Sequence, residues 1–513
     1  MWNIILIGAG GTGMSGIAML LYDLWYRNLI AIDAMESTLM LNIDAKWIKT
    51  IIWHGKYIIQ RDDIVVYSDI SSIISWPELK TSYNYQQTPI QDNDHICLSY
   101  NQLIAEISKY FLTIAVAGSN GKTSTTGVLI YTLLKKWEIN NKDEITSINI
   151  DLESINANQW TTKVHASQTF GIWIVWWLML NYSQQWYAIN NSVCLDLKSI
   201  FDNIFDKKSN IDISLFKKYI FVIEACEYKD HFLLYDVDYS LVTNIDRDHT
   251  DYFTTYHDYC ESFFKFICNT KQCTILTNSS YASIQSRCEK KSVDIKNIWL
   301  ELKIKEKIII SQDYFLENPK LIGKYHWSNA GMIDKLLQTL WKSEYKKIWN
   351  YLNCWEWIER RMEFIGNNKK WAPIYSDYSH HAPAILGNVD TIQIQFPNKK
   401  IIAIFQPHQA QRVLAWRNDF KLSLAWANHI VIYTLYTARE NFDTMKKDNI
   451  ELKNLNSFDD LGEKFANHIW WQYTNNIDKL IVFIQECNSD SIIVYFSAGD
   501  LDQKIKKIIQ KLD

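Results

Sequence analysis

Long apolar runs are absent from this sequence of 513 residues, and none reaches the ~18 residues that a membrane-spanning helix needs. The opening residues, MWNIILIGAGGTGM, lack the basic segment of a signal peptide and soon reach glycines, which favours a β-strand. An excess of charge is also absent, since 53 basic residues stand against 57 acidic ones and the pI is about 6.3. We therefore expect no membrane insertion and no nucleic-acid partner.

Paired cysteines are absent as well. The nine cysteines include no CxxC pair, and the spacing of Cys260, Cys268 and Cys273 fits no zinc-binding pattern. Reduced thiols of this kind are typical of a cytoplasmic protein, which is the location we expect. At about 150 residues per domain, the length of the chain predicts roughly three domains.

Glycine is unusually scarce. The chain has 16 glycines and 22 tryptophans, although glycine normally supplies about 7% of the residues in a protein. Glycine and tryptophan together reach about that share. The positions of the tryptophans therefore need an explanation.

The first group of glycines follows an apolar strand at the start of the chain. Gly8, Gly10 and Gly13 form a GxGxxG pattern before a predicted helix, and Asp33 ends a second strand, NLIAID, about twenty residues later. In dinucleotide sites this spacing places a pyrophosphate at the helix N-terminus and a ribose hydroxyl on the carboxylate. Alone, the pattern leaves two alternatives open, a nicotinamide or flavin dehydrogenase and a purely structural turn.

The second group of glycines is more specific. The strand TIAV leads into the loop GSNGKT and then into a helix. Backbone N–H groups of such a loop can surround phosphates, Lys122 adds a positive charge, and the hydroxyl of Thr123 can hold Mg²⁺. This loop predicts the use of ATP, for which a dehydrogenase has no need.

Two further strands end in polar side chains. The apolar strand YIFVIE ends at Glu224, and SLVTNI is followed by Asp246, Asp248 and His249. Because ligands of open α/β sheets bind at the carboxyl ends of the strands, we expect Glu224 and His249 to lie near Lys122. Oxygen and imidazole ligands suit Mg²⁺ or Mn²⁺.

With these motifs in this order, the chain resembles the Mur ligases, ATP-dependent enzymes that build the peptide of peptidoglycan. The resemblance covers nearly the whole chain. It is carried by IGAGGTGMSGIA, AVAGSNGKTSTT, EACEYKDHF, TNIDRDHTDYF, GKYHWSNA, WIERRMEFIG, YSDYSHHAPAI, FQPHQAQR and SAGD. It implies three α/β domains: a Rossmann-like UDP-sugar domain at 1–110, a central ATP-binding domain at 111–353 and a C-terminal Rossmann-like domain at 354–513.

The resemblance also implies roles for individual residues. ATP would contact Gly118, Ser119, Asn120, Gly121, Lys122, Thr123, Ser124, Asn329, Arg361, Asp377 and Tyr378. Thr123, Glu224 and His249 would hold Mg²⁺ or Mn²⁺. The substrates would contact Gly8, Gly10, Gly11, Gly13, Met14, Ser15, Asp33, His408 and Arg412. The residues expected to carry the chemistry are Lys122, Glu224, His249, His380 and Arg412.

The implied reaction joins L-alanine to the lactyl carboxylate of UDP-N-acetylmuramate. The γ-phosphoryl group of ATP would move to that carboxylate, and the alanine amine would attack the resulting acyl phosphate. Cations must stabilise the transferring phosphoryl group, and Arg412 can hold a carboxylate through two hydrogen bonds. Two alternatives stay open: a ligase that recycles a whole tripeptide onto the same sugar, and a nucleotide-binding relative without ligase activity. The protein would be a monomer or a homodimer.

Some positions depart from the family pattern. Asn120 and Gln409 stand where the family has a histidine and an arginine, and Gly323-Lys324-Tyr325-His326 replaces the usual Gly-x-His-Asn. The segment 190–218 is longer and more polar than expected, and no role is predicted for it.

At least six of the tryptophans stand at positions where the family has glycine or where a helix is expected to end. Trp176 and Trp177 replace a Gly-Gly pair, and Trp53 and Trp357 also replace glycines. Two more, Trp25 and Trp137, follow predicted helices at the C′ position, where a left-handed backbone favours glycine. We interpret the tryptophans as glycines encoded by UGA and read as tryptophan. The alternative is an aromatic-rich variant.

Overall fold

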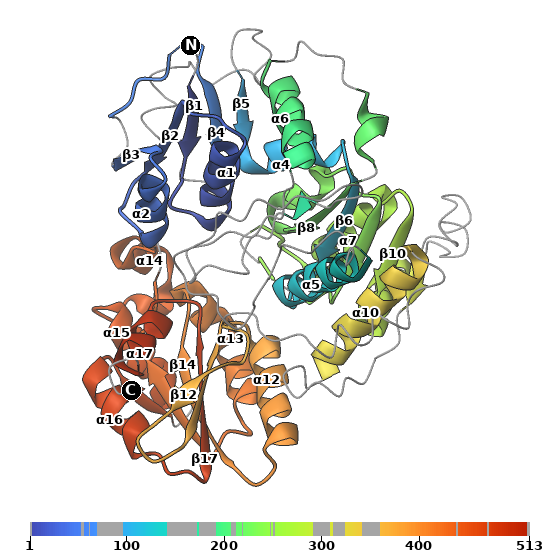
Figure 1. Cartoon of the computed structure of the whole chain (residues 1–513). Coiled ribbons are helices and arrows are strands. Elements are labelled where there is room, and N and C mark those ends of the chain that lie inside the picture. The colour runs from blue at the N-terminus through green and yellow to red at the C-terminus, as the bar shows by residue number, and fades with distance from the viewer. Residues whose placement is uncertain are drawn as a thin grey trace. The chain divides into compact units, whose positions relative to one another are not determined.

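The computed structural model describes residues 3–52, 56–60, 62–68, 96–140, 172–173, 191–206, 212–217, 219–246, 248–249, 252–290, 308–310, 324–340, 360–437, 440–468 and 471–509. These residues form three sheets, each with helices packed against it (Figure 1). The predicted α/β fold class is confirmed. No helix in these ranges is long and apolar enough to cross a membrane.

The first sheet has the strand order β3-β2-β1-β4-β5, and its described pairs are all parallel. Its strands are β1 (Ile4–Ile7), β2 (Leu29–Asp33), β3 (Lys49–Ile52), β4 (Ile64–Tyr67) and β5 (Cys97–Ser99), and its helices are α1 (Thr12–Asp23), α2 (Thr38–Ala45) and α4 (Tyr100–Ser108). Alternate residues of β1 enter two different cores, because both faces of this sheet are covered.

The central sheet has the order β11-β10-β9-β6-β8-β7 and is also parallel. Its strands are β6 (Leu112–Ala117), β7 (Ile172–Trp173), β8 (Ile220–Glu224), β9 (Tyr239–Val242), β10 (Cys273–Leu276) and β11 (Ile308–Ile310). Its helices are α5 (Lys122–Asn140), α6 (Asn191–Asp206), α7 (Tyr256–Asn269), α8 (Asn278–Lys290) and α10 (Lys324–Leu340), with the 3₁₀ turns η2 (Ile213–Phe216) and η3 (Tyr228–Leu234).

The third sheet has the order β12-β13-β17-β14-β15-β16, and only the β12–β13 pair among its described pairs is antiparallel. Its strands are β12 (Glu363–Asn367), β13 (Pro373–Asp377), β14 (Lys400–Gln406), β15 (His429–Tyr433), β16 (Gln472–Thr474) and β17 (Ser491–Ser497). Its helices are α12 (Ala382–Gln395), α13 (Ala410–Ser423), α14 (Phe442–Asp448), α15 (Phe458–His468), α16 (Ile477–Glu486) and α17 (Leu501–Ile509), with the 3₁₀ turn η5 (Ile450–Leu452).

The chain forms two compact units, one of residues 1–314 with 328–354 and one of residues 315–327 with 355–513. The first two sheets belong to the first unit, and one continuous apolar core runs through both of them. The third sheet has its own cores on its two faces. The domain boundaries at 110/111 and 353/354 stay predictions.

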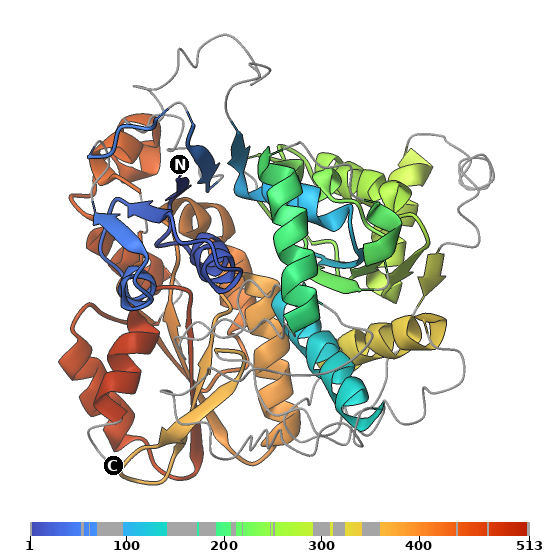
Figure 2. The same cartoon turned by 45° about the horizontal axis from the view of Figure 1, so that its top comes forward.

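Part of the segment without a predicted role, 190–218, forms the amphipathic helix α6 (Figure 2). Its residues Leu197, Ile200 and Phe201 are buried in the core that the first two sheets share, and the helix contacts α4. The hydroxyl of Tyr26, which follows α1, donates to Asp202 Oδ1 at 2.6 Å. Thus α6 packs in the shared core and also binds the residue that follows the C-terminal end of α1.

Tryptophan occupies backbone positions that normally require glycine. Trp25 has φ 65° and lies at the C′ position of α1. Its N–H bonds the carbonyl of Tyr22, and the N–H of Tyr26 bonds the carbonyl of Leu21, which together form the Schellman motif. Trp47 has φ 63° directly after the C-cap of α2. The prediction of a left-handed C′ residue at position 25 is confirmed.

A third left-handed tryptophan closes the turn between β12 and β13. Trp371 has φ 65°, its N–H bonds the carbonyl of Asn368, and its side chain is 76% exposed. In such hairpin turns the left-handed position is commonly glycine. The sequence pattern pointed to neither Trp47 nor Trp371.

The prediction for Trp137 is wrong. The helix α5 continues to Asn140, so position 137 lies inside the helix and not at its C′ position. Trp53, Trp176, Trp177 and Trp357 lie outside the described residues.

We expect Trp25→Gly, Trp47→Gly and Trp371→Gly each to raise the free energy of unfolding by about 1 kcal/mol, because the left-handed conformation costs a non-glycine residue ~1–2 kcal/mol. Urea unfolding of the full chain measures the change. Trp426→Gly is the control, since Trp426 is also exposed but is not among the residues with positive φ. A gain for Trp426→Gly equal to that for Trp371→Gly would contradict the backbone explanation. Peptide mass spectrometry of the protein from its natural host should read glycine at position 25.

Candidate active site

The glycine loop after β6 has the backbone geometry of a phosphate-binding loop. It leaves the carboxyl end of β6 and enters α5 at Lys122. Gly118 has φ 137° and Gly121 has φ 80°, so both positions favour glycine. A Cβ atom on Gly118 would lie 2.0 Å from Thr243 Oγ1, which leaves no room for a side chain.

The loop is held in place by the segment after β9 and by α7. The backbone N–H of Asn120 donates to Asn244 Oδ1 at 2.9 Å, and the hydroxyl of Thr243 donates to the carbonyl of Asn120 at 2.5 Å. Ser119 Oγ bonds the carbonyl of Asp246 at 2.7 Å and the hydroxyl of Tyr259 at 2.8 Å. These bonds fix the loop without using the side chains of Lys122 and Thr123.

Lys122 forms a buried ion pair with Glu227. Its Nζ lies 2.9 Å from Glu227 Oε2 and 3.1 Å from Oε1, and it also donates to the carbonyls of Gly118 and Ser119. The Glu227 side chain is fully buried. Burial works against the charged ammonium, but the Glu227 carboxylate outweighs it and raises the pKa of Lys122 above its usual value.

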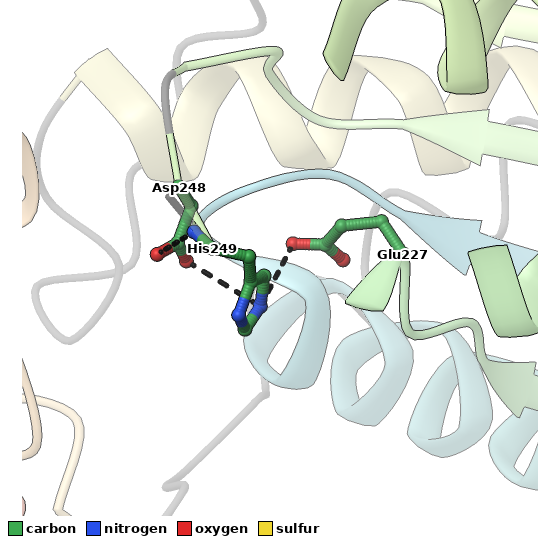
Figure 3. Close-up of side chains that lie close together, drawn as sticks. All are labelled: Glu227, Asp248 and His249. Atoms are coloured by element: carbon green, nitrogen blue, oxygen red, sulfur yellow. Dashed lines mark hydrogen bonds and ion pairs between the residues drawn. The ribbon is translucent and has the colours of Figure 1, made fainter. Parts of the chain in front are cut away.

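The predicted metal ligands fall into two places. Thr123 Oγ1 donates to Glu224 Oε1 at 3.1 Å at the start of α5. His249 lies instead with Glu227 and Asp248, and one ligand atom from each of the three lies within 4.8 Å of the others (Figure 3). His249 Nε2 is 3.7 Å from Glu227 Oε1 and 3.7 Å from Asp248 Oδ2.

Glu227 and Asp248 were not among the predicted metal ligands. Glu227 does not end a strand but lies in the loop between β8 and η3, and its burial results from contacts with Lys122 and Tyr259. The sequence carried one signal for it, the second glutamate of the string EACEY, three residues after Glu224. Asn329 of α10, predicted as a nucleotide residue, lies beside the loop. A Cβ atom placed on Gly121 would be only 3.2 Å from its Nδ2.

The first glycine loop lies at the carboxyl end of β1. The carboxylate of Asp33 forms a hydrogen bond with the backbone of this loop. Gly8 has φ 83°, and Asp33 Oδ2 accepts a hydrogen bond from the N–H of Gly10 at 2.8 Å. The residues predicted for the sugar nucleotide continue into α1, where the side chains of Met14 and Ser15 are buried. The remaining ones, Gly11 and Gly13, lie at the N-cap and in the first turn of that helix.

In the second compact unit, the predicted nucleotide residues gather at the end of β13. Asp377 accepts hydrogen bonds from the backbone N–H groups of Met362 at 2.9 Å and Ser379 at 2.7 Å. The guanidinium groups of Arg360 and Arg361 lie 4.7 and 5.4 Å from the centre of the Tyr378 ring. Burial raises the pKa of Asp377, although Arg361 partly opposes this.

Three histidines and an arginine form a second group in this unit. The ring of His380 lies 4.2 Å from that of His381 and 5.3 Å from that of His408. Burial, aided by Arg412, lowers the pKa of His408 to about 4, and burial lowers the pKa of His380 well below its usual value. The carboxylate of Glu440 accepts the N–H groups of Ala410 and Gln411 at the start of α13. Glu440 was not predicted from the sequence.

The neutral form of His408 gives the folded protein a dependence on pH. Because the folded pKa is about 4, below the ordinary value of about 6.5, the stabilisation is present above pH 6.5 and is lost as the pH falls towards 4. We expect an effect on the order of 3 kcal/mol. Urea unfolding at pH 7.0 and 4.5 should show a smaller loss in His408→Gln than in the wild type. His429→Gln, an exposed histidine of the same unit, should keep the wild-type loss; an unchanged loss in His408→Gln would refute the assignment.

Comparisons with known proteins agree with one another. Residues 213–330 match the family model of the Mur ligase middle domain. A UDP-N-acetylmuramate–L-alanine ligase of Ligilactobacillus salivarius is 23% identical over 97% of this chain and 94% of its own length. A ligase of the same name from Alkaliphilus metalliredigens is 25% identical over 85% of this chain and 84% of its own.

Solved structures show the same fold. The crystal structure of UDP-N-acetylmuramate-alanine ligase MurC from Thermotoga maritima matches with a TM-score of 0.64 and 14% identity, over 100% of this chain and 99% of its own. A murein peptide ligase from Psychrobacter arcticus matches with a TM-score of 0.56 and 16% identity, over 100% and 99%.

Proposed function

Because this chain belongs to the Mur ligase family, we propose that it is an ATP-dependent ligase that joins L-alanine to the lactyl carboxylate of UDP-N-acetylmuramate. The reaction belongs to the cytoplasmic synthesis of peptidoglycan precursors. The observation that carries the proposal is the glycine loop of residues 118–121 with Lys122, Thr123, Glu224 and His249 around it. The near full-length similarity to ligases of that name supports the choice of substrates.

The loop supplies what a triphosphate needs. The N-terminus of α5, at the end of the loop, attracts phosphate oxygens, and Lys122 adds a charge that can follow the transferring phosphoryl group. Gly118 and Gly121 allow the loop to pass close to Thr243 and Asn329, where a Cβ atom would meet their side chains. Attack by the lactyl carboxylate then yields ADP and an acyl phosphate, and attack by the amine releases phosphate and forms the amide bond.

The side chains around the loop fit Mg²⁺ or Mn²⁺. Carboxylate oxygens, a hydroxyl and one imidazole are donors that these ions accept, and a buried carboxylate such as Glu227 is stabilised by a cation. We propose Thr123 and Glu224 as one set of ligands and Glu227, Asp248 and His249 as another. Such an ion supplies positive charge next to the phosphoryl group while it transfers.

The second unit carries side chains whose chemistry suits a carboxylate, an amine and an aromatic ring. Arg412 can bind a carboxylate, and the neutral imidazoles of His380 and His408 can accept a hydrogen bond from the amine. Tyr378, with the guanidinium groups of Arg360 and Arg361 over its ring, is the aromatic side chain that we propose for the nucleotide side. A ligase for a whole tripeptide is the second candidate, favoured by the murein peptide ligase among the structural matches.

We expect Lys122→Ala to lower the rate of ATP hydrolysis that depends on UDP-N-acetylmuramate and L-alanine by about 100- to 1000-fold, as the loss of one group that stabilises the transition state typically does. Phosphate release at saturating Mg²⁺ measures this rate. Lys109→Ala, which removes an exposed lysine paired with Glu106, is the control and should keep the wild-type rate. Near wild-type turnover in Lys122→Ala would reject this site.

The amino-acid substrate is tested by kcat/KM for L-alanine and for a tripeptide with the same sugar nucleotide. We expect L-alanine to be preferred, and we expect Arg412→Lys to raise the KM for L-alanine because a lysine cannot form the paired hydrogen bonds. A preference for the tripeptide would move the assignment to a recycling ligase and leave the phosphoryl chemistry in place.

A further inference from the structure

Glu227 belongs to two parts of the site at once. It is the carboxylate of the ion pair with Lys122, and it also lies in the group with Asp248 and His249 (Figure 3). Its Oε1 accepts the hydroxyl of Tyr259 at 3.0 Å and lies 3.7 Å from His249 Nε2. Its side chain has no exposed surface, so water does not stabilise its charge.

In this arrangement Lys122 points back into the protein. Its Nζ contacts both oxygens of Glu227 and the loop carbonyls of Gly118 and Ser119, and these contacts use its capacity for hydrogen bonds. To reach a phosphate, the ammonium group must leave Glu227. The buried carboxylate would then lose its compensating charge, which is strongly unfavourable unless another cation replaces it.

We propose that Lys122 and a divalent cation compete for Glu227, so that binding of the cation releases Lys122 for the phosphates of the nucleotide. The proposal rests on the proposed function, since it takes the loop as the nucleotide site. Glu227 thereby couples the two ligands. A bound cation raises the affinity for the nucleotide, and a bound nucleotide raises the affinity for the cation by the same factor. Without the cation, the nucleotide must separate the ion pair; without the nucleotide, the cation must displace the ammonium.

Tyr259 acts as a positioning residue in this coupling. Its hydroxyl bonds Glu227 Oε1 and Ser119 Oγ, and Ser119 belongs to the glycine loop. The ring is held from two sides, by Phe253 at 5.0 Å and by Phe263 at 5.1 Å between ring centres. The carboxylate therefore stays in place when its cationic partner changes.

The test measures Mn²⁺ binding to the nucleotide-free full-length protein by electron paramagnetic resonance of the free ion. Lys122→Met removes the competing charge at nearly constant volume, and we expect it to bind Mn²⁺ at least ten times more tightly than the wild type. Lys229→Met is the matched control, because Lys229 lies 5.4 Å from the ring of Tyr228, which contacts His249, but has no contact with Glu227 among the described interactions. Its affinity should stay within a factor of two. Equal affinity in Lys122→Met and the wild type, or an equal gain in Lys229→Met, would overturn the proposal.

The reciprocal measurement uses ADP with excess EDTA and isothermal titration calorimetry. Glu227→Gln should bind metal-free ADP several times more tightly than the wild type, since no carboxylate holds Lys122. It should bind Mn²⁺ more weakly than the wild type, since the group with Asp248 and His249 has lost its buried carboxylate. If either single variant fails to fold by circular dichroism, Lys122→Met/Glu227→Gln removes both buried charges, and it should bind Mn²⁺ no more tightly than the wild type. Unchanged ADP and Mn²⁺ affinities in Glu227→Gln, or tighter Mn²⁺ binding in the double variant, would refute the coupling.

Neither experiment contains UDP-N-acetylmuramate or an amino acid. A wrong choice of substrates in the proposed function would therefore leave both results intact. Failure of the coupling, in turn, would leave the measured ligase turnover unchanged.

Discussion

The parallel pairing of β6 with β8 and β9 is the constraint from which the arrangement of the central site follows. The register places Val116 opposite Glu224 and Ala117 opposite Val242, so the three strands end at nearly the same level. The residues of these strands are mostly buried and mostly apolar, and Glu224 and the Thr243–Asn244 pair stand at their carboxyl ends. The glycine loop, Glu224 and the Thr243–Asn244 pair therefore meet at one edge of the sheet.

The backbone is least regular where the charged side chains converge. Lys229 and Asp230 have φ values of 54° and 60° and interrupt η3 directly after Glu227. His249 has φ 49°, which is uncommon outside glycine. Left-handed residues of this kind persist only where surrounding contacts hold them, and here they flank the group of Glu227, Asp248 and His249. The local conformation thus brings together side chains that regular strands could not.

Much of the central fold could be predicted because its signals are local. An apolar strand, a glycine loop and a helix follow one another within some twenty residues, and the structure has the same elements at those positions. Glu227 could not be found in this way, since its burial depends on Tyr259, 32 positions away, and on Lys122, 105 positions away. The end of α5 was mistaken for a similar reason: the residues around Trp137 resemble a helix end in composition, but the helix continues to Asn140.

The place of β17 in the third sheet has a consequence for the synthesis of this protein. Ser491–Ser497 is fully buried and lies between β13 and β14, although it follows both of them in sequence, about 85 residues or more after the end of β14. Until the ribosome has released these residues, β13 and β14 each present an unpaired edge, which is prone to pair with other chains. The glycine loop and its partners on β8 and β9 are complete well over two hundred residues earlier. The central glycine loop and its partners can thus form early in translation, whereas the third sheet closes only after β17 has left the ribosome.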